Sequence, residues 1–382
     1  MLKQVFVVAD NIFSPLGYNT DENLAALQMG KTAVRQHQNF RSSGQTVVAS
    51  LFENNVEERL IHDNTFSLFE KILIASIQDA LQNATIQSDD AKTIVIISST
   101  KGNISAVENG INREALAEQT SLINSATKIS AWFRNSNKPV VVSNACISGL
   151  AALGVGKRLI QSGKYDHAIV AGADLITRFI QSGFDSFQAL SNEVCKPFDR
   201  KRNGINLGEA AATVILSKHP GQKNISTTIS GLSVSNDANH ISGPSRTGEE
   251  LALAIQRAMQ EASVSPEDVG FLSAHGTATV YNDEMEAKAF RLSGLTQVPM
   301  NSMKGYYGHT LGAAGLLEAI VTIRSILGHT VFPSYGFEES GVSVDLNICQ
   351  SLLQTEILHA VKTASGFGGC NAAMVISKNK TA

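Results

Sequence analysis

A cysteine at the boundary between an expected strand and an expected helix has the clearest chemical potential in this chain. Cys146 follows the β-branched run 139–143 and precedes an apolar, helix-forming segment that starts at Gly149. A thiol at the N-terminus of a helix lies at the positive end of the helix dipole, which stabilises a thiolate and offers free N–H groups to an oxyanion. Cys146 is therefore a candidate nucleophile, while a buried structural cysteine remains the alternative for this segment taken alone.

Two histidines further along the chain complete a Cys–His–His set. The first, His275, follows the expected strand 269–273 and precedes the hydroxyl groups of Thr277 and Thr279. This position places its imidazole in a loop that faces a pocket. A lone histidine in such a loop is more often structural, so the inference of a site depends on the second histidine.

The second histidine lies in a segment that also carries a lysine, an acid and small residues. His309 comes five residues after Lys304, and the small residues 312–315 and Glu318 lie beyond it. Small residues allow a helix to approach another backbone closely, and the lysine places a positive charge near the imidazole. Alone, the glycines indicate only tight helix packing; together with Lys304 and His309 they predict a site.

Two further segments carry polar or flexible groups. The acids Asp283 and Glu286 follow the first histidine motif at the spacing of a helix start, and we expect N-cap and first-turn acids there. The glycine-rich loop 365–371 contains Phe367 but lacks the lysine of a phosphate-binding loop. We expect it to supply a mobile aromatic ring and a backbone N–H that points at an oxyanion.

Composition restricts the class of protein. The chain has 382 residues, 43% of them hydrophobic and 17% charged, and its formal net charge of −3 favours neither nucleic acid nor a membrane surface as a partner. No run approaches the ~20 apolar residues of a membrane-spanning helix, and no signal peptide is recognised. The four cysteines have no C-x-x-C spacing, which disfavours zinc and redox pairs. We expect no metal and a reducing, cytoplasmic setting.

The elements that must position these residues alternate between strand and helix. This order predicts α/β layers. A polar stretch at 218–224 separates two halves of similar element order, so we predict a duplicated unit: residues 1–220 carry the cysteine and residues 221–382 carry both histidines. The first strand is expected to end at Asp10, and residues 36–65 receive no assignment. Other expected strands are 94–97, 166–172, 211–216, 225–234 and 373–376, with a helix at 249–262.

Taken together, the motifs resemble the β-ketoacyl-[acyl-carrier-protein] synthases, the condensing enzymes of type II fatty acid and polyketide synthesis in the thiolase superfamily. The resemblance runs nearly end to end. It implies a thiolase-like α/β fold with a duplicated, layered αβαβα architecture. The segments that carry it are IFSPLG at 12–17, PFDRKRNG at 197–204, LGEAA at 207–211, the cysteine segment, HGT-x-T at 275–279, K-x4-H-x2-GAAG at 304–315 and GFGG at 366–369.

The resemblance also implies a reaction, a decarboxylative Claisen condensation of a cysteine-bound acyl chain with a malonyl carrier protein. Cys146 would receive the acyl chain as a thioester. His275 and His309 would hydrogen-bond the malonyl thioester carbonyl as the enolate forms, with Lys304 and Glu318 supporting them electrostatically. These roles agree with a dipole-activated thiolate acting as nucleophile beside two enolate-stabilising donors.

Further implied roles belong to the walls of the site. The backbone N–H groups of Cys146 and Phe367 would form the oxyanion hole, and Phe367 would gate the cysteine. Thr277 and Thr279 would hydrogen-bond the phosphopantetheine arm. That arm would be carried by the partner acyl carrier protein, so no cofactor of the chain's own is expected.

Some positions depart from the family pattern without touching the Cys–His–His set. The departures, Ile147, Ser365, Ile205 and Cys370, leave gating and chain length open. The acyl substrate and the pathway, primary fatty acid or specialised, are open as well. By resemblance, the acyl tunnel would be lined by Phe179, Phe184, Phe187 and Leu190.

Three alternatives share the fold. A thiolase would need a second cysteine in a C-x-G loop, whereas Cys370 is followed by Asn371 and Ala372. A non-catalytic chain-length factor would lack the nucleophile. A malonyl decarboxylase or an acyltransferase needs the same Cys–His–His set and is the main alternative.

The resemblance finally implies partners. An acidic acyl carrier protein would bring the acyl and malonyl thioesters and dock at a basic patch, for which residues 200–202 are candidates, although a solvated loop is the simpler interpretation. The run 139–143 would pair across a two-fold axis. We therefore expect a homodimer, or a heterodimer with a subunit that resembles a chain-length factor.

Overall fold

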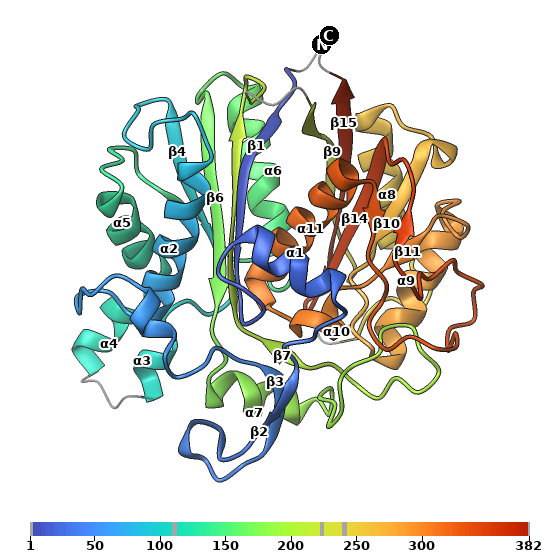
Figure 1. The fold of residues 1–382 in the computed structure, drawn as a ribbon, viewed down its shortest axis with the longest axis horizontal. Helices are drawn as coiled ribbons and strands as arrows, with labels where there is room; N and C mark the ends of the chain where they lie inside the picture. The colour runs from blue at the N-terminus through green and yellow to red at the C-terminus, as the bar shows by residue number, and fades with distance from the viewer. Residues whose placement is uncertain (1–2, 109–112, 222–224, 239–242, 381–382) are drawn as a thin grey trace.

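Ten hydrogen-bonded strands form the framework of the computed structural model, which describes residues 3–108, 113–221, 225–238 and 243–380. Five strands belong to the first part of the chain: β1 (Phe6–Phe13), β4 (Thr93–Ser98), β5 (Val140–Val142), β6 (His167–Asp174) and β8 (Ala210–Ser217). Five belong to the second part: β9 (Ile225–Asn236), β10 (Val269–Ser273), β11 (Met300–Asn301), β14 (His359–Gly366) and β15 (Cys370–Lys380). Their order across the array is β11-β10-β14-β15-β9-β1-β8-β6-β4-β5 (Figure 1).

The two sets of five strands have the same topology. Counted along the chain, each set is arranged from its outer edge inward as third, second, fourth, fifth and first strand. In both sets the second strand runs parallel to the third and the fourth, while the fourth, fifth and first pair antiparallel. The repeat confirms the predicted duplicated α/β fold, although no sequence repetition indicates it. The boundary at residue 220 remains a prediction.

The two sets meet along a very short seam. In β1, Phe6 and Val7 pair with Thr228 and Thr227 of β9, and β1 otherwise pairs with β8. The sets diverge beyond this seam, and two helices fill the space between them, α6 (Ser148–Gln161) and α11 (Ala314–Gly328) (Figure 1). Both helices contact strands from each set as well as each other.

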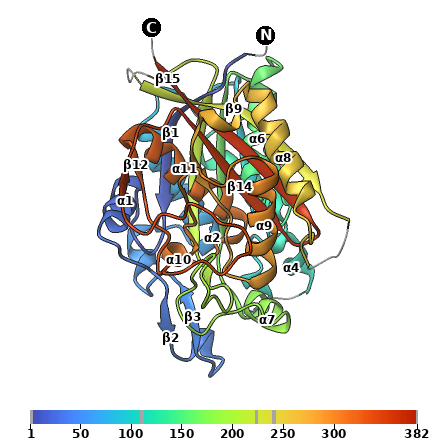
Figure 2. The ribbon, with the colours of Figure 1, turned by 90° about the vertical axis from the view of Figure 1, so that its right-hand side faces the viewer.

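The outer helices complete five layers. The helices α2 (Leu68–Gln82) and α5 (Leu122–Trp132) cover the outside of the first set, and α8 (Glu249–Ala262) and α9 (Val280–Leu292) cover the second (Figures 1 and 2). Because both faces are covered, β4 and β8 are buried at every residue, which explains why their sequences are continuous apolar runs. The remaining helices are α1 (Thr20–Gln28), α3 (Ser105–Glu108), α4 (Arg113–Thr120), α7 (Arg178–Ser186) and α10 (Lys304–Tyr307).

The central helices approach each other at two glycines. A Cβ atom on Gly149 would lie 2.7 Å from the backbone N of Leu316, and one on Gly315 would lie 2.8 Å from the backbone N of Leu150. Real Cβ atoms do not come so close to backbone, so only glycine allows this approach. The expectation that small residues at 312–315 permit close helix packing is confirmed.

One of these helices tests the expectation about membranes. Residues Leu311–Gly328 are long and apolar enough to cross a membrane, contrary to the expectation that no run comes near this length. However, 83% of this segment is buried inside the molecule. The helix is apolar because it packs between two layers of strands.

Two local expectations were incomplete. The strand β1 continues through Asp10 to Phe13, because the Asp10 carboxylate accepts hydrogen bonds from Arg324 and Thr20 and is thereby tolerated inside the sheet. Residues 36–65, left unassigned, form short elements, and β7 (Leu207–Gly208) joins two of them in a small sheet. These elements are β2 (Arg35–His37), β3 (Val47–Ser50) and 3-10 turns at Phe40–Ser42 and Val56–Arg59; β12 (Thr330–Val331) and β13 (Leu353–Gln354) form a further pair.

The glycine contact gives a stability prediction. Gly315→Ala should lower the free energy of unfolding by about 1–3 kcal/mol, the usual cost of overpacking, because α6 and α11 must separate. Urea denaturation followed by circular dichroism measures this change. The matched control is Gly328→Ala in the same helix, where a Cβ meets nothing within 4 Å. Equal stability of the two variants would contradict the packing argument.

Candidate active site

A strained turn presents Cys146 between β5 and α6. The residue before it, Ala145, has a φ of +43°, a left-handed conformation that a non-glycine residue adopts only when its surroundings enforce it. The Ser148 hydroxyl enforces it here, accepting from the Asn144 N–H at 2.8 Å and donating to the Ala145 carbonyl at 2.6 Å. The turn leaves Cys146 7% exposed, at the wall of a cavity.

The glycine-rich loop between β14 and β15 lies against this turn. A Cβ on Gly366 would be 2.9 Å from the Cys146 backbone N, so only glycine fits there. The next residue, Phe367, directs its backbone N–H at the Cys146 sulfur. The Sγ of Cys370 lies 3.5 Å from the Phe367 carbonyl oxygen and 3.9 Å from that of Asn144, and so links loop and turn. The predicted oxyanion donors, Cys146 and Phe367, therefore lie on adjoining segments.

The protonation state of Cys146 differs from the expectation of a thiolate. Burial raises the pKa of Cys146 to about 12, while the positive charge of Lys304 and the Phe367 N–H oppose the rise. A rise from 9.0 to about 12 corresponds to roughly 4 kcal/mol, and a helix terminus supplies at most ~2 kcal/mol. The resting site therefore holds a thiol.

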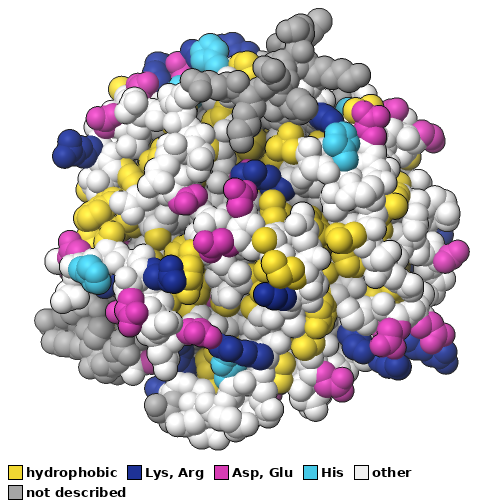
Figure 3. Space-filling model, viewed as in Figure 1, with side chains coloured by type: hydrophobic (Ala, Val, Ile, Leu, Met, Phe, Trp, Pro, Cys, Tyr) yellow, Lys and Arg dark blue, Asp and Glu magenta, His cyan; other side chains and the backbone are white. Residues whose placement is uncertain are grey.

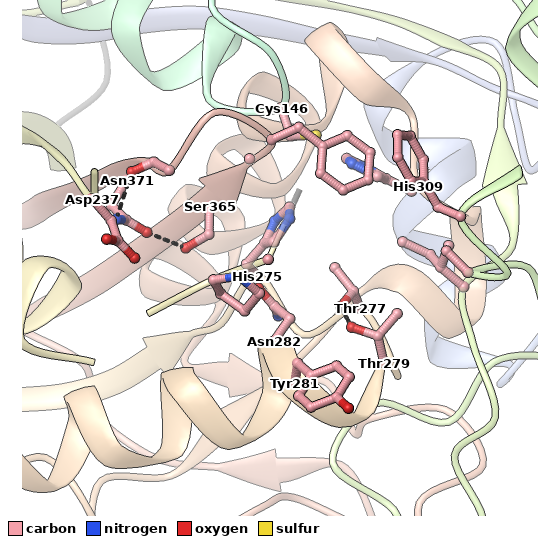
Figure 4. Close-up of a pocket in the computed structure, with 18 of the residues that line it drawn as sticks. Cys146, Asp237, His275, Thr277, Thr279, Tyr281, Asn282, His309, Ser365 and Asn371 are labelled. Atoms are coloured by element: carbon pink, nitrogen blue, oxygen red, sulfur yellow. Dashed lines mark hydrogen bonds between the residues drawn. The ribbon is translucent and has the colours of Figure 1, made fainter. Parts of the chain in front are cut away.

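Both histidines lie beside the cysteine in one cavity. The rings of His275 and His309 are each 2% exposed, and their centroids are 5.2 Å apart at an interplanar angle of 83°. Figure 4 shows Cys146, His275 and His309 converging at one end of this cavity. The structure thus brings together the Cys–His–His set that the sequence places on three separate segments.

Two buried acids hold the backbone of the first histidine loop. Glu286 accepts hydrogen bonds from the N–H groups of His275 at 2.9 Å and Gly276 at 2.6 Å. Asp283 accepts from the N–H groups of Thr277 at 2.9 Å and Phe198 at 2.7 Å. Both acids were expected to serve their own helix as capping or first-turn residues. Asp283 does lie in the first turn of α9, as expected, whereas Glu286 lies in the next turn. Both carboxylates are buried and hold the backbone of the loop.

His309 is fixed through its backbone. Its N–H donates to the Asn206 carbonyl at 2.7 Å, and its own carbonyl accepts from the Gly208 N–H at 2.9 Å. Among the residues that the structure describes, neither ring nitrogen of His309 has a hydrogen-bond partner, although both are buried. A buried imidazole left in this state is arranged to hydrogen-bond a ligand in the cavity.

A buried ionic cluster lies behind His275. The Glu318 carboxylate on α11 forms a close ion pair with Lys304 through one oxygen and a 2.7 Å ion pair with Lys362 through the other. The Lys304 Nζ lies 3.4 Å from His275 Nδ1. An ammonium group can only donate, so Nδ1 accepts and Nε2 carries the ring proton. The predicted neighbours Lys304 and Glu318 are in place, whereas Lys362 was missed; its only signal was a lysine directly after the apolar pair Ala360-Val361.

This cluster keeps both histidines neutral. Burial lowers the pKa of His275 well below 6.5, and the charges of Lys304 and Lys362 lower it further. The same causes, in the same order, lower the pKa of His309. Neutral imidazoles can donate one hydrogen bond each to a developing oxyanion without adding a second positive charge.

Cys146 lies where two cavities adjoin. One, of about 200 Å³, contains the histidines and is also lined by Thr277 and Thr279, whose hydroxyl oxygens lie 2.8 Å apart. Tyr281 and Asn282 line it as well (Figure 4). The contact of Thr277 and Thr279 with a substrate arm stays a prediction. Within the described ranges, no cluster of three or more His, Cys, Asp or Glu side chains could hold a metal ion.

The second cavity is larger and more apolar. It measures about 840 Å³ and lies on the α7 side of the Phe367 ring. That ring packs against Phe187 and Phe184 at centroid distances of 5.1 and 5.6 Å. Three of the four residues expected along an acyl tunnel, Phe179, Phe184 and Phe187, line it. Leu190 does not line this cavity.

The departures from the family pattern surround the nucleophile. Ile205 and Ser365 line the smaller cavity, and the Ser365 hydroxyl donates to Asn371 at 2.7 Å (Figure 4). Ile147 is fully buried in the core behind the cysteine. None of these side chains replaces a member of the Cys–His–His set.

The basic candidates at 200–202 lie on a neutralised surface. Arg200 pairs with Glu339 at 2.9 Å, and Lys201 pairs with Glu338 at 2.8 Å. Arg202 is almost buried and donates to the carbonyls of Asp199 and Gly341. This trio is therefore a structural loop and not an exposed basic patch.

The sequence and the fold each match known proteins. The model of the β-ketoacyl synthase N-terminal domain matches residues 2–220, and that of the C-terminal domain matches residues 226–338. The 3-oxoacyl-[acyl-carrier-protein] synthase 2 of Vibrio cholerae is 28% identical, over 98% of this chain and 99% of the relative.

Solved structures agree with the sequence matches. The ketosynthase ApeO of Xenorhabdus doucetiae, solved in complex with its chain length factor ApeC, superposes with a TM-score of 0.83 at 25% identity and 98% coverage of both chains. A β-ketoacyl synthase from Burkholderia phymatum superposes with a TM-score of 0.87, at 23% identity, over 99% of this chain and 100% of that one. The predicted thiolase-like fold is confirmed, and this chain belongs to the β-ketoacyl synthase family of condensing enzymes.

Proposed function

We propose that the chain joins a Cys146-bound acyl group to a malonyl thioester by decarboxylative Claisen condensation. The observation that supports this most directly is the convergence of a strained, buried cysteine with two neutral histidines in one cavity. Membership of the family supports the reaction class, and the arrangement of the side chains supports the roles given below.

Acyl transfer comes first in this proposal. The Cys146 sulfur attacks the carbonyl carbon of an incoming acyl thioester, and the carrier thiol leaves with the proton that Cys146 gives up. The oxyanion of the tetrahedral intermediate is stabilised by the backbone N–H groups of Cys146 and Phe367. Burial disfavours a free thiolate, so proton loss is coupled to attack on the bound thioester.

Decarboxylation and condensation follow on the acylated enzyme. The malonyl carboxylate leaves as carbon dioxide, and its electron pair forms an enolate on the thioester carbonyl. His275 and His309 each donate a hydrogen bond to that enolate oxygen. The ring proton of His275 is on Nε2, and neither ring nitrogen of His309 has another hydrogen-bond partner in the described structure. The enolate carbon then attacks the acyl carbonyl, and the Cys146 sulfur leaves as a thiolate, which takes a proton from solvent to restore the resting thiol.

The substrate arm would enter through the smaller cavity. A phosphopantetheine chain carries amide groups that need hydrogen-bond partners along a narrow passage. Thr277 and Thr279 offer hydroxyl groups there, and the two-cavity arrangement separates the carrier side from the acyl side of Cys146. An acyl carrier protein is the partner that this geometry favours.

Carrier docking would have to use charges other than those at 200–202. On the face drawn in Figure 3, Lys and Arg are interspersed with Asp and Glu, and the described side chains form no large area of one sign. We therefore place docking at the mouth of the smaller cavity, beside the exposed Tyr281. A cytoplasmic setting, where carrier and malonyl thioesters would be at hand, is part of the same proposal.

A dimer would cover the outer edge of the first strand set. The edge strand β5 pairs only with β4 in the described structure, and its valines are half-buried. The larger cavity nearby carries the exposed rings of Phe179 and Phe187. Exposed apolar edges are normally covered, and the covering subunit is either a second copy or a chain-length-factor-like chain such as the one bound to ApeO.

The half-reactions provide the central test. His309→Ala should reduce carbon dioxide release from malonyl carrier protein about 10²-fold, the usual loss for one oxyanion-type donor, while acyl loading on Cys146 changes little. Radiolabelled malonyl and acyl carrier proteins separate the two steps. Cys146→Ala is the paired control and should abolish loading.

Two results would argue against this assignment. If the Cys146→Ala protein still formed a covalent acyl-enzyme, Cys146 would not be the nucleophile. If His309→Ala lowered the rates of loading and decarboxylation equally, His309 would not act specifically in decarboxylation. A wild-type protein that releases carbon dioxide but forms no 3-oxoacyl product would support the decarboxylase alternative.

The acid side of the pH profile gives another test. The pKa values of His275 and His309 lie well below 6.5, so both rings stay neutral as the pH falls through 6.5. We expect the decarboxylation rate of the wild-type enzyme to be flat between pH 8 and 6.5 and to fall only at lower pH. Single-turnover release of labelled carbon dioxide measures this directly. An acid limb centred at or above pH 6.5 is the contrary outcome.

If a second subunit covers the edge strand β5, the protein is a dimer in solution. Analytical ultracentrifugation should give a species of two chains, either of this protein alone or after co-expression with a chain-length-factor-like subunit. The monomer mass is 40.7 kDa. A stable, active species at that mass would contradict burial of the β5 edge.

A further inference from the structure

Lys362 is a buried cation that the proposed reaction does not yet use. It lies on β14 and has no exposed surface. Its Nζ is 2.7 Å from Glu318 Oε2 and donates hydrogen bonds to three backbone carbonyl oxygens, those of Thr363 at 2.6 Å, Ala274 at 3.1 Å and Ser273 at 3.3 Å. An ammonium group surrounded by one carboxylate and three carbonyls is fully solvated by the protein.

These contacts reach the residues directly before His275. Lys362 is in register with Ser273, the last residue of β10, where β10 and β14 run parallel. Its neighbour Thr363 receives a hydrogen bond from the His275 N–H at 3.2 Å through its hydroxyl, which in turn donates to Glu286 at 3.0 Å. Two adjacent residues of β14 therefore fix the carbonyl and amide groups of residues 273–275.

The same ammonium completes the pairing of Glu318. A buried carboxylate needs compensation for its charge, and each oxygen of Glu318 faces one lysine. The contact with Lys362 is an ion pair without hydrogen-bond geometry. With two lysines and one glutamate, the cluster carries a local charge of +1 by simple addition. Lys304, Lys362 and His309 act on the His275 ring, and Glu286 lies under its backbone.

We propose that Lys362 is a positioning residue for malonyl decarboxylation. Its ammonium group holds residues 273–275 and Glu318 in place, so that Lys304 reaches His275 Nδ1 and both imidazoles remain neutral donors. This inference depends on the proposed function, since it assigns a role within that reaction. Lys362 touches neither cavity wall and acts only through Glu318, Lys304 and His275.

A purely structural lysine would behave differently. Replacing a lysine that has only a structural role would lower stability, because the partner carboxylate is left unpaired, but it would not separate decarboxylation from acyl loading. Lys362→Met therefore distinguishes the two roles, because methionine fills the space of the lysine stem without its charge. In the chain, Lys157 offers a matched control: it is also buried, pairs with Glu261 at 2.9 Å and donates to the Ser230 carbonyl, but it lies outside the site.

The expected result for Lys362→Met has two parts. The rate of decarboxylation should fall about 10- to 100-fold, the usual loss when a catalytic group is misplaced. The rate of acyl loading on Cys146 should change by less than about twofold, which is much smaller than that loss. The acid limb of decarboxylation should also move to higher pH. Loss of a positive charge raises the pKa of the nearby histidines, so they protonate at a higher pH. Lys157→Met should leave both readouts at their wild-type values.

Chemical rescue provides the second variant. Lys362→Ala leaves a space ringed by the carboxylate and the three carbonyls, and ammonium chloride should restore part of the decarboxylation rate. Tetramethylammonium chloride at the same ionic strength is too large and cannot donate, so it should restore nothing. Circular dichroism and thermal unfolding accompany each variant.

The outcomes separate this inference from the proposed function. If the wild-type enzyme neither decarboxylates nor condenses, the proposed function fails. If the wild-type enzyme catalyses both reactions, and Lys362→Met has the same decarboxylation rate and the same acid limb as the wild type, only the positioning role of Lys362 is overturned. An unfolded Lys362→Met protein, together with a Lys362→Ala protein that gains nothing from ammonium, also overturns it in favour of a structural role.

Discussion

The placement of the catalytic residues depends on one carboxylate that is shared between two ammonium groups inside the protein core. Glu318 lies on the central helix α11, Lys304 on the preceding helix α10 and Lys362 on the later strand β14, so the cluster ties two neighbouring helices to a distant strand. Breaking a buried pair costs about 3–5 kcal/mol because a charge is left unpaired. The three elements are therefore constrained to one arrangement, and His275 is held beside it.

The duplicated topology explains why the nucleophile and the second histidine meet. Cys146 follows β5, the third strand of the first set, and His309 follows β11, the third strand of the second. Each third strand leads into a central helix, α6 or α11, and these helices touch at Gly149 and Gly315. Close contact of the helices brings their N-terminal ends together, and the reactive groups just before those ends share one cavity (Figure 4).

Burial gives the site its electrostatic character. It keeps the cysteine protonated and the histidines neutral, while the lysine–glutamate cluster places a fixed charge close to His275. Such a site has preorganised donors and little free charge, which favours stabilisation of an oxyanion that appears only during reaction. The open, aromatic cavity on the other side of Cys146 contrasts with it.

The sequence by itself determined the elements and the chemistry of the site. Strand and helix periodicity placed the strands around Cys146 and before His275, and α8 has the predicted bounds. The types and spacing of Cys146, Lys304 and His309 indicated the nucleophile and its partners, because these motifs are local in the chain.

Only the tertiary structure decided the protonation states and the supporting contacts. The pKa of Cys146 depends on how deeply the turn is buried, and no local pattern states that depth. In the sequence, the acids Asp283 and Glu286 are typical of a helix start, and their bonds to the histidine loop form only because α9 packs behind that loop. The contacts of Lys362 likewise form only because β14 lies beside β10 and α11. Burial and long-range pairing are properties of packed elements, so residues that act through them are recognised only when the chain is folded.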